Sequence, residues 1–141
     1  MLNFEPESKK TDVNAAIEFL TRVVKRPCTA FVLSDFYVRS DFEHVLQIAN
    51  RKHDVIAVQV YDIRAKELPD VGLMKVSDAE TGHEMLVDTG SVKLRNAYKA
   101  NWLKRQDELQ AVFSKSNVDC ISIATNDDYV KKLMALFAQR S

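Results

Sequence analysis

The sequence predicts an α/β domain built on a mostly parallel sheet with helices on both faces. Three short apolar runs rich in β-branched residues are spaced along the chain, and segments of helical periodicity separate them. Strands that alternate with helices favour right-handed crossovers, which make neighbouring strands parallel. We therefore expect a crevice outside the carboxyl ends of the strands, where ligands of such sheets bind.

A helix and a strand are predicted first. Apolar residues recur at spacings of four, three and four, which predicts that they lie on one face of a helix. This helix begins near Thr11 or Asp12 and stops before Pro27. The face consists of Val13, Ile17, Leu20 and Val24. The continuous apolar run from Thr29 to Leu33 predicts a strand buried on both faces.

The next two elements repeat this pattern. Ser40 and Glu43 have the spacing of a capping box, and the helix that they open has a regular apolar stripe. This stripe contains Phe42, Val45, Leu46 and Ala49. The run from Val55 to Tyr61 predicts a second strand, which ends at the carboxylate of Asp62.

A hairpin and a long helix are predicted next. Two short apolar stretches, Leu73 to Val76 and Met85 to Val87, flank the turn-prone residues 80–82 and predict a β-hairpin insertion. The segment from Ser91 to Lys115 is rich in helix formers and predicts one amphipathic helix that ends at Asn117. Its apolar positions are Tyr98, Trp102, Leu109, Val112 and Phe113.

A third strand and a final helix complete the predicted order. Cys120 to Ala124 predicts the strand, and Thr125, Asn126 and Asp127 are candidates to cap the helix that follows. We expect the helix to turn four apolar residues inward: Val130, Leu133, Met134 and Phe137.

The composition fits one globular domain over residues 1–141, with 46% hydrophobic and 28% charged residues. Lys plus Arg and Asp plus Glu balance at 20 each, so no net charge attracts the chain to nucleic acid or to an anionic membrane. No apolar run is long enough to cross a bilayer, and residues 1–10 lack a signal-peptide core. Since Cys28 and Cys120 each open an apolar run, we expect free thiols in a reducing, cytoplasmic compartment.

Hydroxyl and acidic residues follow all three predicted strands and should meet at one rim of the sheet. They are Ser34, Asp35, Asp62, Thr125 and Asp127. Oxygen ligands of this kind suit Mg²⁺ or Mn²⁺. Asp62 and Asp127 stand where Asp commonly caps the next helix, so we expect them to be structural. Asp35 is separated from the Ser40 cap by residues 36–39, and we therefore expect it to be functional.

Thr11 is a second candidate metal ligand. It precedes the helix that leads to the first strand, which lets it approach the rim beside Asp35, although helix capping alone would also explain it. Other chemistry has less support. The three histidines lack partners at metal-ligand spacing, Ser34 lacks an evident histidine base, and the glycine-rich phosphate motifs are absent.

Several segments occur in a characteristic order along the chain. They are Thr11-Asp12 and the segments 31–36, 52–58, 67–72 and 78–82, with Asp127-Asp128-Tyr129-Val130 near the C-terminus. In this order the chain resembles the C-terminal part of the domain-of-unknown-function 58 family, which carries a von Willebrand factor A-like (vWA) domain. The resemblance extends from about Pro6 to near the C-terminus.

This resemblance implies a metal-ion-dependent adhesion site, built in related domains from D-x-S-x-S, a Thr on a second loop and an Asp after a later strand. By position, Thr11 and Asp35 would be the second and third elements. No D-x-S-x-S occurs in this sequence. We therefore expect a partial vWA-like, Rossmann-like three-layer sandwich with about three parallel strands and a hairpin insertion, which binds Mg²⁺ in the complete parent domain but not in this fragment.

The family also implies partners. Its vWA domains are usually protein-interaction modules in which the ion binds a partner's carboxylate, so partner contacts are expected at Ser34, Asp35 and Phe36. Its members carry N-terminal membrane helices, which would anchor the parent in the inner membrane, and they are associated with MoxR-type AAA+ ATPases.

Two functions follow from these observations. The leading hypothesis is a non-enzymatic protein-interaction module. The alternative is a metal-dependent hydrolase of phosphoesterase type that uses Asp35 with Asp62 or Asp127. Such catalysis needs a positioned nucleophile or a second metal, and the sequence shows no compact set of that kind.

An open sheet edge is the last expectation. In the vWA strand order, the strand from Thr29 to Leu33 pairs with a first, central strand that this sequence lacks. Its unpaired backbone groups beside Phe31 and Leu33 would be a template for association. We therefore expect a homodimer or higher oligomer that buries this edge by strand pairing or by packing of the exposed sheet faces.

Overall fold

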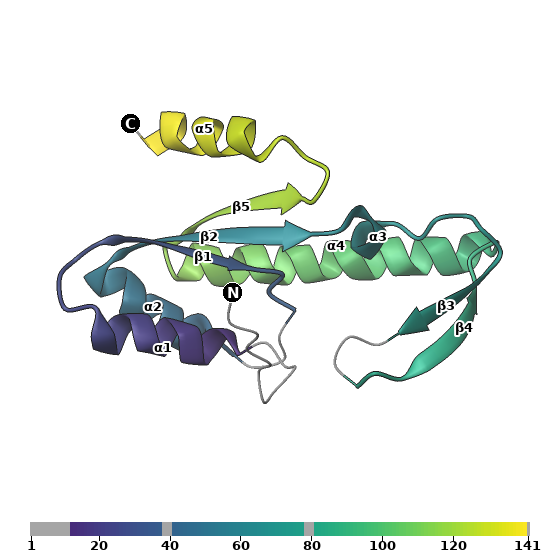
Figure 1. The fold of residues 1–141 in the computed structure, drawn as a ribbon, viewed down its shortest axis with the longest axis horizontal. Helices are drawn as coiled ribbons and strands as arrows, with labels where there is room; N and C mark the ends of the chain where they lie inside the picture. The colour runs from purple at the N-terminus through teal and green to yellow at the C-terminus, as the bar shows by residue number, and fades with distance from the viewer. Residues whose placement is uncertain (1–11, 38–40, 78–80, 141) are drawn as a thin grey trace, which may run out of the picture.

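The computed structural model describes residues 12–37, 41–77 and 81–140. Its main sheet is parallel and contains, in spatial order, β1 (Thr29–Ser34), β2 (Asp54–Tyr61) and β5 (Asp119–Ala124) (Figure 1). A separate antiparallel hairpin consists of β3 (Leu73–Ser77) and β4 (Glu84–Asp88). The predicted fold class, an α/β domain with a three-stranded parallel sheet and an inserted hairpin, is confirmed.

Helices cover the two faces of the sheet unequally. Three of them lie on one side: α1 (Val13–Val23), α2 (Glu43–Lys52) and α4 (Val92–Lys115) (Figure 1). On the opposite side lies α5 (Tyr129–Arg140), and the single turn of α3 (Ile63–Lys66) follows β2. The arrangement is a three-layer sandwich with one thick and one thin outer layer.

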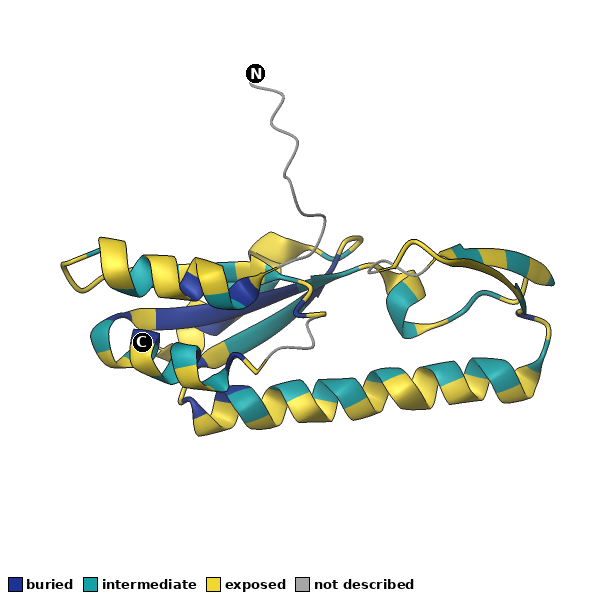
Figure 2. Cartoon of the chain, turned by 90° about the horizontal axis from the view of Figure 1, so that it is seen from below, coloured by how far each residue is buried: buried dark blue, intermediate teal, exposed yellow. Residues whose placement is uncertain are grey.

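The central strand β2 supplies a core to each face because its side chains alternate in direction. Val55 and Ala57 belong to the larger core, which also contains Val13, Ile17, Phe36, Phe42, Leu46, Ala49, Phe113 and Val118. Ile56 and Val58 belong to a smaller core with Ile123 and Leu136, under α5. Figure 2 shows the result: burial is concentrated along the sheet, and the hairpin lies largely exposed.

The helix starts reflect local hydrogen bonds. Asp12 caps α1 by accepting the Ala15 N–H at 2.9 Å, as predicted for a start near this residue. The predicted capping box of α2 is wrong, because Glu43 is the first residue of the helix rather than its third. The Glu43 N–H is bound by the Asp41 carboxylate at 3.0 Å. Ser40 lies outside the described residues.

The long helix α4 confirms its predicted limits. Ser91 caps it by accepting the Leu94 N–H at 3.2 Å, and Asn117 follows its end with a left-handed backbone, φ 56°. Phe113 is buried in the larger core, whereas Trp102 is half-buried against the ring of Tyr61, 5.1 Å between centroids. None of the described helices has both the length and the apolar character needed to cross a lipid bilayer.

Two burial predictions are wrong. β1 is not buried on both faces: Val32 packs on the larger core, but Phe31 is 43% and Leu33 66% exposed. On α5 the buried residue is Leu136, whereas Val130, Met134 and Phe137 are exposed. The reason is the position of α5, which makes its buried contacts with β2 and β5. The face of β1 on the α5 side of the sheet is therefore left uncovered.

Candidate functional site

The carboxyl ends of the three parallel strands bring the predicted polar residues to one rim. Ser34 ends β1, Asp62 follows β2, and Thr125 follows β5. The Thr125 N–H donates to the Tyr61 carbonyl at 2.8 Å, which joins two of these strand ends directly. The rim predicted from the strand order is therefore present, and its chemistry depends on what each side chain already binds.

Asp35 and Ser34 shape the turn that leaves β1. The Ser34 hydroxyl accepts the Phe36 N–H, and the Asp35 carboxylate accepts the Tyr37 N–H, each at 3.0 Å. These bonds hold Phe36 at a left-handed φ of 54°, where a bulky side chain is uncommon. Asp35 is exposed and caps no helix, and it is the Asp41 carboxylate that binds the first N–H of α2. A metal-binding role for Asp35 remains a prediction.

Phe36 does not fit the partner-contact role expected for it. Its side chain is only 2% exposed and packs against the rings of Phe42 and Phe113 in the larger core. A partner could reach it only if the core opened. The left-handed turn explains the difference, because it directs the residue after Asp35 inward, which the sequence pattern does not indicate.

The other two rim carboxylates have structural partners, in agreement with their expected roles. Asp62 caps α3 by accepting the Arg64 N–H at 2.8 Å. Asp127 accepts the Ala124 N–H at 2.9 Å and the Lys132 ammonium at 2.6 Å. The Lys132 hydrogen bond is the main cause that lowers the pKa of Asp127, so this side chain is held as an ion-paired carboxylate.

Asp127 does not cap α5, although the sequence indicates it as one of three candidates. The next residue, Asp128, caps the helix instead, because its carboxylate accepts the Lys131 N–H at 3.2 Å. Thr11, the other predicted metal ligand, lies outside the described residues. Within the described ranges, no three or more His, Cys, Asp or Glu side chains are grouped closely enough to hold a metal ion.

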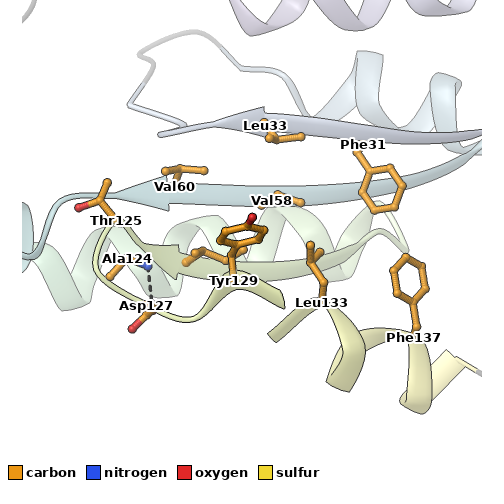
Figure 3. A pocket seen from close by; sticks show the side chains of 11 residues that line it. Phe31, Leu33, Val58, Val60, Ala124, Thr125, Asp127, Tyr129, Leu133 and Phe137 are labelled. Carbon is orange, nitrogen blue, oxygen red and sulfur yellow. Dashed lines mark hydrogen bonds between the residues drawn. The ribbon is translucent and has the colours of Figure 1, made fainter. Parts of the chain in front are cut away.

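Sequence reasoning missed an apolar groove beside the sheet. It encloses about 530 Å³ between the uncovered face of the sheet and α5 (Figure 3). Its lining is Phe31, Leu33, Val58, Val60, Ile123, Ala124, Thr125, Asp127, Tyr129, Leu133 and Phe137. Among these side chains only Thr125, Asp127 and Tyr129 carry a polar group, so the site suits apolar side chains.

Two aromatic rings meet at one end of the groove. Phe31 on β1 and Phe137 on α5 meet edge to face, with ring centroids 6.1 Å apart, at the end away from the rim (Figure 3). Leu133 and Phe137 belong to the apolar stripe with Val130 and Met134 that helical spacing defines. The exposed stripe therefore extends the apolar surface beyond the groove. The stripe is visible in the sequence, but its spacing predicts burial and gives no sign of a groove.

The groove borders an open strand edge. Within the described part of the chain, β1 pairs with β2 alone, in the register Thr29 with Asp54 through Ser34 with Gln59. Among residues 12–37, 41–77 and 81–140, no strand pairs with the outer edge of β1, which agrees with the open edge expected from the sequence. Phe31 and Leu33 line the groove and belong to this edge strand, so the groove and the edge form one continuous surface.

Comparison with known protein families matches residues 1–108 to the family described as "Protein of unknown function DUF58". The chain belongs to this family. The match includes β1, β2, the hairpin and the first two-thirds of α4, and it ends before β5 and α5. Two of the three strands of the parallel sheet in this DUF58 chain thus lie inside the family match, and the α5 wall of the groove lies outside it.

Curated relatives of this DUF58 chain are mycobacterial and uncharacterized. A protein of Mycobacterium avium is 29% identical over 138 residues, which cover 96% of this chain and 79% of that protein. Proteins of Mycobacterium bovis and Mycobacterium tuberculosis are each 27% identical over 137 residues. Those 137 residues cover 96% of this chain but 42% of either relative. No solved structure matches the chain significantly.

Proposed function

We propose that this chain is a non-enzymatic protein-interaction module whose binding surface is the groove between β1 and α5 together with the exposed apolar stripe of α5 beside it. The observation that carries the proposal is the exposure of an amphipathic stripe. Val130, Met134 and Phe137 follow the spacing of a helix face that should pack against protein, yet they are 50%, 67% and 47% exposed. Contiguous apolar surface of this kind marks interaction sites on soluble domains.

The shape of the surface supports binding of a protein segment. The groove is an open trough of about 530 Å³ whose floor is the sheet and whose wall is a helix. Apolar anchors of a partner would bury Leu33, Phe137 and their neighbours, while the few polar atoms at the rim end would orient the segment. The aromatic rings of Phe31 and Phe137 provide rigid contact area at low entropic cost.

The alternative function, a metal-dependent hydrolase, has less support. Each described rim carboxylate already has a hydrogen-bond partner in the fold: Asp35 binds the Tyr37 N–H, Asp62 the Arg64 N–H, and Asp127 the Ala124 N–H and Lys132. Two-metal or nucleophilic catalysis would need these groups to converge on one reacting atom. Their structural roles instead keep them at separate turns.

A vWA-like origin is part of the same proposal. The parallel order β1-β2-β5, the rim position of Asp35 and the open β1 edge are consistent with the C-terminal part of such a domain. In that case Thr11 and Asp35 would complete a Mg²⁺ site only together with a D-x-S-x-S segment. A structure of the longer Mycobacterium tuberculosis relative would show whether such a strand pairs with the equivalent of β1.

The proposed partner is a MoxR-type AAA+ ATPase, which the family resemblance suggests. The test uses biolayer interferometry to measure binding of the purified chain to a purified MoxR-type ATPase. Met134→Lys places a charge on the apolar surface and should weaken binding roughly tenfold or more. Leu86→Lys on β4 is the matched control, because Leu86 is similarly exposed, at 72%, and lies on the hairpin. Equal binding by the parent and Met134→Lys, or no binding by the parent, would contradict the proposal.

A further inference from the structure

The edge of β1 lacks the features that usually prevent strand association. Natural edge strands are protected by charged side chains, by proline or by bulges. The six residues of β1, Thr29–Ser34, include no charged residue and no proline. Its backbone therefore presents a regular, neutral edge six residues long, next to apolar side chains that are already exposed.

The direction of its side chains restricts how a second strand can pair with it. Phe31 and Leu33 face the α5 side, whereas Val32 packs on the core beneath the opposite face. A two-fold axis perpendicular to the sheet makes two copies of β1 antiparallel and keeps equal faces together. Odd-numbered residues of one copy must then lie opposite odd-numbered residues of the other. This allows Phe31 to lie opposite Phe31 of the second copy, across the axis.

The charges that flank β1 are complementary in this antiparallel arrangement. Lys25 and Arg26 precede the strand and are exposed, and Asp35 follows it and is exposed. With Phe31 on the axis, Asp35 of one copy lies opposite Pro27 and beside Arg26 of the other, and the contact occurs twice. Parallel pairing would instead bring like charges side by side. Antiparallel pairing about Phe31 also leaves Pro27, which has no N–H to donate, at the end of the ladder.

We propose that a second copy of this chain occupies the β1 edge, so that the two β1 strands pair antiparallel at the centre of a mixed six-stranded sheet with Phe31 on the two-fold axis. The two grooves then join across the axis, and the second copy contributes its Phe31 and Leu33 to the floor of the combined site. This pairing does not depend on the MoxR-type partner, since it involves the in-plane edge of the sheet rather than the α5 stripe.

Cross-linking of the full chain tests the register. In a Cys28→Ser background, which removes the exposed native thiol, Phe31→Cys should form an intermolecular disulfide under mild oxidation. Directly opposed residues of an antiparallel pair have Cβ atoms about 4.5–5.5 Å apart, close to disulfide geometry. Leu33→Cys is the matched control. In this register position 33 lies opposite Thr29, so two introduced thiols would be about 14 Å apart along the strands.

Sedimentation and charge reversal test the dimer itself. The parent should sediment with twice the mass of one chain, and Arg26→Glu should raise the dissociation constant roughly tenfold because two flanking ion pairs become repulsive. Adding Asp35→Lys to that variant should restore association, with circular dichroism confirming the fold. Equal cross-linking at positions 31 and 33, or a dimer indifferent to Arg26→Glu, would overturn the pairing. A chain that stays monomeric at high concentration would also overturn the pairing. Slow amide exchange along β1 in that monomer would show that another segment of the same chain covers the edge.

Discussion

The ring of Phe36 meets the ring of Phe113 edge to face, with centroids 5.2 Å apart and planes at 81°. Phe42 completes the cluster, 5.7 Å from Phe36 and 6.1 Å from Phe113. The cluster joins the turn after β1, the start of α2 and the end of α4. Through it, the position of Asp35 at the rim depends on core packing against a helix that is distant in the sequence.

Truncation of Phe113 should strongly destabilise the protein. Phe113→Ala removes a ring that is 2% exposed, and the lost transfer energy plus the cavity should lower the free energy of unfolding by about 3–5 kcal/mol. Trp102→Ala should cost clearly less, because Trp102 is half-buried against Tyr61. Urea denaturation of both variants measures the difference. Equal losses would show that the two ends of α4 are equally packed.

The stability of Asn117 variants should depend on how well the new residue tolerates the left-handed backbone at this position. Its φ of 56° favours residues that tolerate the left-handed region, and its carbonyl accepts the Asn50 amide at 2.9 Å whatever side chain it carries. Asn117→Ala should therefore lower the unfolding free energy by about 1 kcal/mol, whereas Asn117→Gly should preserve or raise it. Thermal melts of the two variants provide the measurement, and the reverse order would mean that the side chain, not the backbone, matters.

The Asp127 carboxylate should contribute stability that is lost in acid. Its hydrogen bond from Lys132, with that from Ala124, lowers its pKa in the folded protein below the ordinary value of 3.8. The contribution is therefore complete above the unfolded pKa and disappears as the pH falls through the lower folded pKa. Asp127→Asn should be less stable near neutral pH and lose less stability below pH 4 (about the unfolded pKa). Denaturant titrations across this range test it, with Asp107→Asn as a control for net charge.

Divalent cations should bind the chain weakly. Thr11 and Asp35 together offer one carboxylate, and Mg²⁺ gives up its water reluctantly. Calorimetric titration with MgCl₂ or MnCl₂ should show no tight, saturable site. Should a tight site appear and vanish in Asp35→Ala, these residues would suffice for metal binding without a D-x-S-x-S segment.

The two cysteines should differ strongly in reactivity. Cys28 is exposed, whereas burial raises the pKa of Cys120 to about 11, which leaves little thiolate at neutral pH. Iodoacetamide at mildly alkaline pH should label Cys28 first, and mass spectrometry of tryptic peptides would follow both rates. Rapid labelling of Cys120 in the native protein would mean that β5 opens readily at its start.

Much of the fold could be predicted because its signals are local. The runs at Val55 and Cys120, the hairpin stretches and the limits of α4 all depend on residues near one another in sequence, and the structure confirms them. The rim was also predictable, since parallel strands align their carboxyl ends. The start of α2 was not, because a capping-box spacing at Ser40 cannot show that the helix begins only at Glu43.

The sequence by itself determined the order of strands and helices and the amphipathic spacing of α5, because periodicity and capping act over a few residues. The tertiary structure alone decided which apolar residues are buried. Phe36 entered the core through a left-handed turn, while Phe31, Leu33 and Met134 remained exposed because α5 covers β2 and β5 but leaves the same face of β1 open. Burial depends on what lies across from a side chain, and a local pattern shows only the direction in which that side chain would point.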